Sequence, residues 1–201
     1  MFTYPVNHTD IGIVYGIDPG SIRLGLSIFT LHFKTYQILD IHTETIEVDK
    51  LYVDPNLVDV RGYKTARLME LSNLLYDKMC VDQPVVLSIE SPFYNRFRPN
   101  AYGTLVETTD YIKLAYNNYN NMLPLHSYPP LTVKKAVGVK KSKGKENVSK
   151  AIMAIGELTC HLPHNLTGMS EHEIDAVAVA YTYVQSLRDY GDPWSVPTYV
   201  K

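Results

Sequence analysis

A chain of 201 residues with 45% hydrophobic and 20% charged residues has the composition of one globular domain. Its net charge is −2, so overall charge gives no reason to expect that it binds nucleic acid. No run approaches the roughly 20 apolar residues that a membrane helix needs, and the N-terminus does not resemble a secretory signal, so no membrane partner is expected. Cys80 and Cys160 stand apart, so we expect two buried, reduced thiols in a cytoplasmic protein rather than a disulfide framework.

Hydrophobic periodicity predicts three strands before the first helix, and alternating strands and helices after it. In chain order, the predicted elements are strands over 12–17, 25–33 and 36–42, a loop over 49–56, a helix over 63–79, a strand over 84–89, a helix over 101–116, a strand over 123–128, and helices over 148–158 and 170–187. This order predicts an α/β fold with a mixed five-stranded sheet and helices on both faces. We expect a single domain over 1–201, with its core over about 12–187 and an irregular tail over 188–201.

Acidic side chains stand where predicted elements end or begin. Asp18 closes the first strand, Glu90 closes the fourth, and Asp175 lies near the polar start of the last helix. If those two strands are parallel neighbours, their acids face one pocket beyond the strand ends. Residues three or four apart share a helix face, so Glu171 and His172 both lie beside Asp175, and this geometry does not choose between them. Taken singly, such residues are more typical of a turn, a solvated strand end or a helix cap.

Carboxylates gathered in one cleft indicate a metal site, because crowded like charges are unfavourable unless a cation neutralises them. Hard divalent cations such as Mg²⁺ prefer the oxygens of carboxylates, waters and phosphates. Two such ions about 4 Å apart can activate an attacking water and stabilise the leaving oxygen of a phosphodiester. The acidic residues therefore favour a hydrolase that uses metal ions and no organic cofactor.

Four ordered motifs resemble those of RuvC-type Holliday junction resolvases, which are ribonuclease H-like nucleases. Gly16-Ile17-Asp18-Pro19-Gly20-Ser21, followed by Gly25, resembles the first motif, and Ser88-Ile89-Glu90-Ser91-Pro92-Phe93 resembles the second. The segments 133–138 and 144–148 resemble the basic region of the family, and His172-Glu173-Ile174-Asp175-Ala176 resembles its closing motif. The order and spacing agree over 12–185, which is nearly the whole chain.

The resemblance implies a ribonuclease H-like fold and a homodimeric endodeoxyribonuclease that resolves four-way, branched double-stranded DNA in recombination and repair. It also implies that Asp18, Glu90, His172 and Asp175 are the catalytic metal ligands, with two Mg²⁺ or Mn²⁺ ions per active site. The motif favours His172 over Glu171 as the partner of Asp175. A proton-carrying role for His172 is an alternative to its role as a ligand.

Basic and aromatic side chains near these motifs are expected to bind DNA, although a run of lysines is commonly just a solvated surface. Lysines that neutralise phosphates release counterions, so such binding should weaken steeply with salt. The family has a base-stacking aromatic residue at the position of Phe93, and a core or lid position is the alternative for this side chain. The predicted DNA-binding residues are Phe93, Arg96, Arg98, Lys134, Lys135, Lys140, Lys141, Lys143 and Lys145.

Two rival functions are consistent with part of this pattern. The motifs position metal and phosphate without encoding branch geometry, so a related nuclease that acts on flaps, forks or RNA is the main alternative. An Asp-x-Gly turn also occurs in actin-like ATPases, but no second such turn follows a strand in this chain. The segment 44–61 and the tail after Asp189 depart from the family pattern, so neither is assigned a role.

Overall fold

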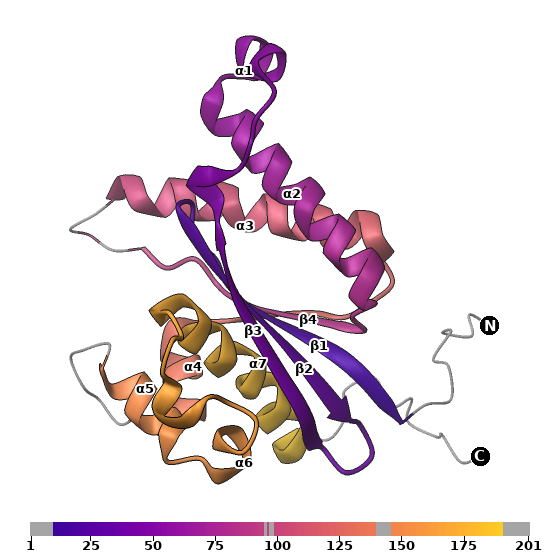
Figure 1. Cartoon of the computed structure of the whole chain (residues 1–201), viewed down its shortest axis with the longest axis vertical. Helices are drawn as coiled ribbons and strands as arrows, with labels where there is room; N and C mark the ends of the chain where they lie inside the picture. Colours follow the sequence, from indigo (N-terminus) through magenta and orange to yellow (C-terminus); the bar gives the residue numbers. More distant parts are fainter. Residues whose placement is uncertain (1–9, 95, 97–98, 140–145, 191–201) are drawn as a thin grey trace.

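A five-stranded mixed sheet forms the centre of the computed structural model, which describes residues 10–94, 96, 99–139 and 146–190 (Figure 1). The strands are β1 (Ile11–Asp18), β2 (Arg23–His32), β3 (Gln37–Glu47), β4 (Val86–Glu90) and β5 (Leu125–Tyr128). They lie in the order β3-β2-β1-β4-β5. The pairs β1–β2 and β2–β3 are antiparallel, whereas β1–β4 and β4–β5 are parallel. The predicted meander and mixed sheet are therefore confirmed.

Helices cover both faces of the sheet, as predicted (Figure 1). On one face lie α2 (Tyr63–Asp82) and α3 (Pro99–Asn120), and on the other lie α4 (Pro130–Ala136), α5 (Glu146–Met153), α6 (Gly156–Thr159) and α7 (Glu171–Tyr190). Residues of β1 belong to two hydrophobic cores, one on each face of the sheet. Val14 packs towards α7, while Tyr15 and Ile17 pack towards α2 and α3. Burial on both faces explains why β1 is a nearly continuous apolar run.

The predicted loop over 49–56 is wrong. Val48–Lys50 is a 3₁₀ turn, η1, and Pro55–Arg61 is a helix, α1, which projects from the body of the molecule (Figure 1). The Asp54 side chain accepts a hydrogen bond from the Asn56 backbone N–H at 2.8 Å, and Pro55 takes the first helical position. This arrangement is a standard helix start, because proline lacks the N–H that would go unpaired there.

Other predicted boundaries also change. The helix expected over 148–158 is two helices, since α5 ends at Met153 and α6 begins at Gly156. Helix α4 and a second 3₁₀ turn, η2 (His164–Leu166), were not predicted. Helix α7 continues to Tyr190, so the first three residues of the expected irregular tail are helical, and 191–201 lies outside the described residues.

Cys80 and Cys160 are free and exposed, which corrects the expected burial. None of the helices in the described part of the chain is long and apolar enough to span a membrane.

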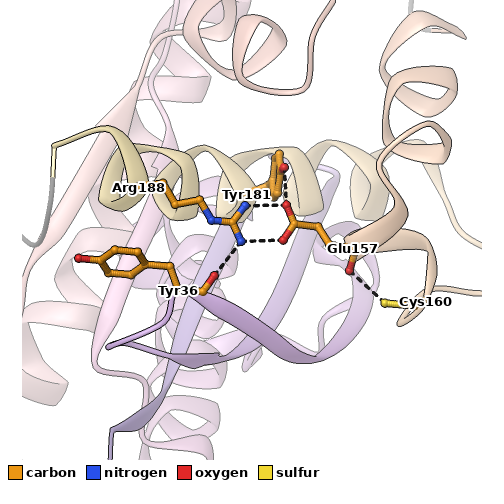
Figure 2. A network of polar contacts seen from close by, with 5 residues as sticks. All are labelled: Tyr36, Glu157, Cys160, Tyr181 and Arg188. Atoms are coloured by element: carbon orange, nitrogen blue, oxygen red, sulfur yellow. Dashed lines mark hydrogen bonds and ion pairs between the residues drawn. The ribbon is translucent and has the colours of Figure 1, made fainter.

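A polar network fixes α6 against α7 and the β2–β3 turn (Figure 2). Arg188 donates to both carboxylate oxygens of Glu157 at 2.6 Å and to the backbone oxygen of Tyr36 at 2.7 Å. The hydroxyl of Tyr181 donates to the same carboxylate at 2.7 Å. The hydrogen bonds from Arg188 hold the pKa of Glu157 below its ordinary value. The C-terminal half of α7 is thereby tied to its surroundings, far from the end that carries His172 and Asp175.

Candidate metal centre and nucleic-acid interface

Four predicted site residues come together at one edge of the sheet. Strands β1 and β4 are parallel neighbours with Ile17 opposite Ile89, so Asp18 and Glu90 leave the sheet side by side. His172 lies in the first turn of α7, and its Nδ1 atom is 2.9 Å from Oδ2 of Asp18. The negative charge of Asp175 acts on Glu90, which places it within the same group. The structure thus brings the four side chains together beyond the ends of β1 and β4.

Two glycines allow α7 to approach the sheet closely enough to bring the four candidate site residues together. A Cβ atom on Gly25 would lie 1.9 Å from the backbone oxygen of His172, and one on Gly16 would lie 2.6 Å from the backbone oxygen of Ala176. Ala180 also contacts Gly16, so small side chains line both sides of the contact. Any larger residue at either glycine would separate α7 from β1 and β2, because close-packed interiors leave no room for added atoms.

Buried serine hydroxyls attach the backbone of α7 to the sheet. The Ser27 hydroxyl donates to the Ala176 carbonyl at 2.8 Å, and the Ser88 hydroxyl donates to the Val179 carbonyl at 3.0 Å. Both serines are fully buried, so each hydroxyl needs a partner to offset the loss of water. These bonds fix the position of α7 along β2 and β4.

The N-terminal end of α7 is also held by β3. Glu173 and Ser170 form the predicted capping box: the Ser170 N–H donates to Glu173 at 2.6 Å and the Glu173 N–H donates to the Ser170 hydroxyl at 3.1 Å. The Thr43 hydroxyl donates to Glu173 at 3.2 Å, and the Thr45 and Ser170 hydroxyls lie 2.5 Å apart. The capping box has a local sequence signal, whereas the threonine contacts have none, because they depend on the pairing of β3 with β2.

The electrostatics of the site centre on Glu90. Burial raises the pKa of Glu90 to about 8, and the negative charges of Asp18 and Asp175 add to the rise. Lys134, in the last turn of α4, lies near enough for its positive charge to oppose this rise. A hydrogen bond between the carboxyl groups of Glu90 and Asp18 raises the pKa further. The raised pKa favours the protonated form of Glu90, and a proton there relieves the charge crowding among these carboxyl groups.

The donor set fits a divalent cation, although the side chains are not arranged as a finished metal cage. Three carboxyl groups and one imidazole are suitable ligands for Mg²⁺ or Mn²⁺. Within the described ranges, no three His, Cys, Asp or Glu side chains are clustered tightly enough to hold an ion as they stand. The contact of His172 Nδ1 with Oδ2 of Asp18 occupies a carboxyl oxygen that a cation would need. A cation held by these residues would need the Asp18 carboxylate turned from His172 and Glu90 in its ionised form.

The predicted DNA-binding residues fall into three groups. Phe93 is 54% exposed, so the alternative of a core position is wrong, and Arg96 and Lys135 are exposed as well. Lys134 is partly buried beside Glu90. The others lie outside the described residues: Arg98, Lys140, Lys141, Lys143 and Lys145. Tyr94 and Tyr102 are further aromatic residues that follow Glu90 and Phe93 along the chain, and no sequence motif marks them.

Comparison with known proteins gives consistent results. A family model described as crossover junction endodeoxyribonuclease RuvC matches residues 14–183. The RuvC protein of a Nitratiruptor species is 27% identical over 180 residues, which cover 87% of this chain and 97% of that protein. The RuvC protein of Prochlorococcus marinus is 27% identical over 171 residues, which cover 84% of this chain and 96% of that protein.

Solved structures show the same fold. T. thermophilus RuvC in complex with a Holliday junction substrate has a TM-score of 0.68 at 20% identity, covering 90% of this chain and 97% of its own. The yeast mitochondrial Holliday junction resolvase Ydc2 has a TM-score of 0.59 at 15% identity, covering 89% of this chain and 81% of its own. These likenesses confirm the predicted ribonuclease H-like architecture.

The contact at Gly25 gives a stability prediction. Gly25→Ala should lower the free energy of unfolding by about 1–3 kcal/mol, because the new methyl group collides with the backbone of His172. Chemical denaturation measures this loss. Gly103→Ala is the matched control: Gly103 is exposed on α3 with open space around its Cβ position, so alanine should stabilise the helix by up to about 1 kcal/mol. Equal effects of the two substitutions would contradict the close approach of α7.

The raised pKa of Glu90 predicts how stability depends on pH without metal. The folded protein binds one more proton than the unfolded chain between the ordinary glutamate pKa of 4.5 and about 8, so the wild type should lose stability as pH rises through this range. In EDTA, Glu90→Gln should be more stable than the wild type at pH 9, by on the order of 2 kcal/mol, and the gap should close towards pH 5. Thermal unfolding at both pH values measures the gap. A gap that is equal at the two pH values would show that burial does not hold the proton on Glu90.

Proposed function

The chain belongs to the RuvC family of crossover junction endodeoxyribonucleases, and from this premise we propose that it cuts four-way DNA junctions by metal-dependent hydrolysis of phosphodiester bonds. The observation that carries the proposal is the gathering of Asp18, Glu90, His172 and Asp175 where β1 and β4 end. Proteins of this family are metal-dependent nucleases, and this gathering of acids is what such chemistry needs.

The proposed metal ligands are Asp18, Glu90 and Asp175, with His172 as a further ligand or as the proton carrier. We propose two Mg²⁺ or Mn²⁺ ions, because three carboxylates can neutralise more than one divalent charge. Such ions, when bound, supply an activated water and stabilise the leaving oxygen of the cut strand. The finding that His172 Nδ1 contacts Asp18 supports a role for the ring in orienting that carboxylate, whichever of the two roles it also has.

The other side chains near the site have proposed roles in binding the substrate. Lys134 stands beside Glu90, where its ammonium group is suited to a phosphate oxygen next to the cut. Arg96, which follows Glu90 in the chain, and Lys135, which follows Lys134, are exposed. We propose that both contact the DNA backbone farther from the cut. A homodimer with twofold symmetry would present two such sites to two symmetric strands of a junction. The proposed place of action is the cytoplasm, on cellular or viral DNA.

The role of Asp18 predicts the decisive change in activity. Asp18→Asn should reduce cleavage of a synthetic four-way junction in Mg²⁺ by at least ~1,000-fold, equivalent to about 4 kcal/mol of transition-state stabilisation, while the junction still binds. Asp40→Asn, which changes an exposed acid on β3, is the matched control and should cleave as the wild type does. Flap and RNA duplex substrates, assayed in parallel, test the choice of substrate. Cleavage by Asp18→Asn at the wild-type rate would refute the metal site, and faster wild-type cleavage of flaps or RNA would refute the junction preference.

The neighbouring lysines of α4 give a second functional prediction. Lys134→Gln should lower kcat about tenfold or more, since the positive charge beside Glu90 is lost where the reaction occurs. Lys135→Gln should instead mainly weaken binding and reduce the slope of log Kd against log salt by about 0.9, the value for one phosphate contact. Cleavage kinetics and a salt titration of binding separate the two effects. Identical effects of the two variants on kcat would mean that proximity to Glu90 gives Lys134 no special role.

A further inference from the structure

A pair of exposed tyrosines lies in the part of the chain that follows Glu90. Tyr94 lies in the link from β4 to α3, and Tyr102 lies near the start of α3. Their ring centroids are 5.8 Å apart and their planes are inclined by 79°, which is an edge-to-face pair. Tyr94 is 64% exposed and Tyr102 is 37% exposed. Large aromatic side chains with this much exposure, next to a functional site, are candidates for binding a ligand.

The geometry of the pair leaves aromatic surface available. In an edge-to-face contact, the edge of one ring meets one face of the other. The contact within the pair therefore uses one of the four ring faces and leaves the other three. Tyr102 stands on a helix of 22 residues, whereas Tyr94 stands on the connecting segment. Tyr102 therefore holds the ring of Tyr94 in place, and a ligand that stacks on Tyr94 meets a preorganised surface.

The position of the pair relates it to the cut. The Ser91 N–H donates to the Tyr128 carbonyl at 2.8 Å, so the chain is still attached to the sheet one residue after Glu90. Tyr94 follows Glu90 by four residues, a path of at most about 14 Å. At about 3.4 Å per nucleotide of one strand, this distance corresponds to roughly four nucleotides or fewer. A base held by the pair would thus belong to the strand near the scissile phosphate.

We propose that Tyr94 and Tyr102 form a platform on which an unpaired nucleobase of the bound junction stacks. The inference rests on the proposed function and adds a base-binding site separate from Phe93. The occupant is a nucleobase because Arg96, two residues after Tyr94, and Lys134, near Glu90, are basic and suited to a phosphate backbone, and because every base offers a face for stacking. The site is therefore expected to accept all four bases.

Photocrosslinking tests the platform directly. The probe is a four-way junction that carries 5-iododeoxyuridine at successive positions within four nucleotides of the cut, bound to the full chain in EDTA to prevent cleavage. We expect a crosslink to Tyr94 or Tyr102 at one of these positions, identified by mass spectrometry of the conjugated peptide. Crosslinks that map only to Phe93, or to residues elsewhere in the chain, would overturn the proposal.

Variants and binding measurements complete the test. Tyr94→Ala and Tyr102→Ala should each weaken junction binding about 5- to 150-fold, the range of one base–aromatic stack, and the double variant should lose less than the product of the two because they act as one unit. Tyr94→Phe and Tyr102→Phe should retain binding and the crosslink. Tyr76→Ala, on α2 before the opposite end of β4, is the control and should bind as the wild type does.

The outcomes separate this proposal from the proposed function. If the wild type fails to cut four-way junctions, the proposed function fails whatever the tyrosines do. If it cuts them, but Tyr94→Ala and Tyr102→Ala bind the junction as tightly as the wild type, only the platform fails. Loss of dimerisation in these variants, measured by sedimentation with junction binding per protomer unchanged, would show that the pair is a contact between protein copies and would overturn the platform.

Discussion

The close approach of α7 to β1 and β2 is the contact on which the candidate site depends. Gly16 and Gly25 have no side chains, so the backbone of α7 rests directly on these strands at Ala176 and His172. Buried hydroxyls of Ser27 and Ser88 then hydrogen-bond to helix carbonyls and hold the helix in register. Since His172 and Asp175 stand at the start of this helix, the packing of small residues in the core determines the distances within the site.

This packing has an electrostatic consequence that connects the fold to the chemistry. Three carboxyl groups are brought together in a partly buried place, and the pKa of Glu90 is raised to about 8 as a result. A proton on Glu90 reduces the repulsion among these groups, and His172 Nδ1 contacts Oδ2 of Asp18. A divalent cation would remove the need for both, so metal binding and proton release should be coupled. The destabilising arrangement of charge is what prepares the site for a metal.

Sequence patterns predicted the parts of this protein that depend on local signals. The strand ending at Asp18 and the capping box of Ser170 each have a signal in residues close together in the sequence, and both are confirmed. The helix that starts at Pro55 also has a local signal in Asp54 and Pro55, but the polar composition of the segment favours a loop. The contact of Thr43 with Glu173 could not be predicted, because it depends on strand pairing and on how closely α7 packs. The exposed pair made by Tyr94 likewise depends on the path of the chain in space.

Anomalous diffraction from crystals grown with Mn²⁺ tests most directly whether the packing of α7 builds a metal site. We expect Mn²⁺ density between Asp18, Glu90 and Asp175, with Oδ2 of Asp18 turned from the His172 ring towards the ion. The same experiment on Gly25→Ala should give weaker density or none, because the start of α7 is displaced. Strong Mn²⁺ density elsewhere in the molecule, and none among these three carboxylates, would contradict the assignment of the site.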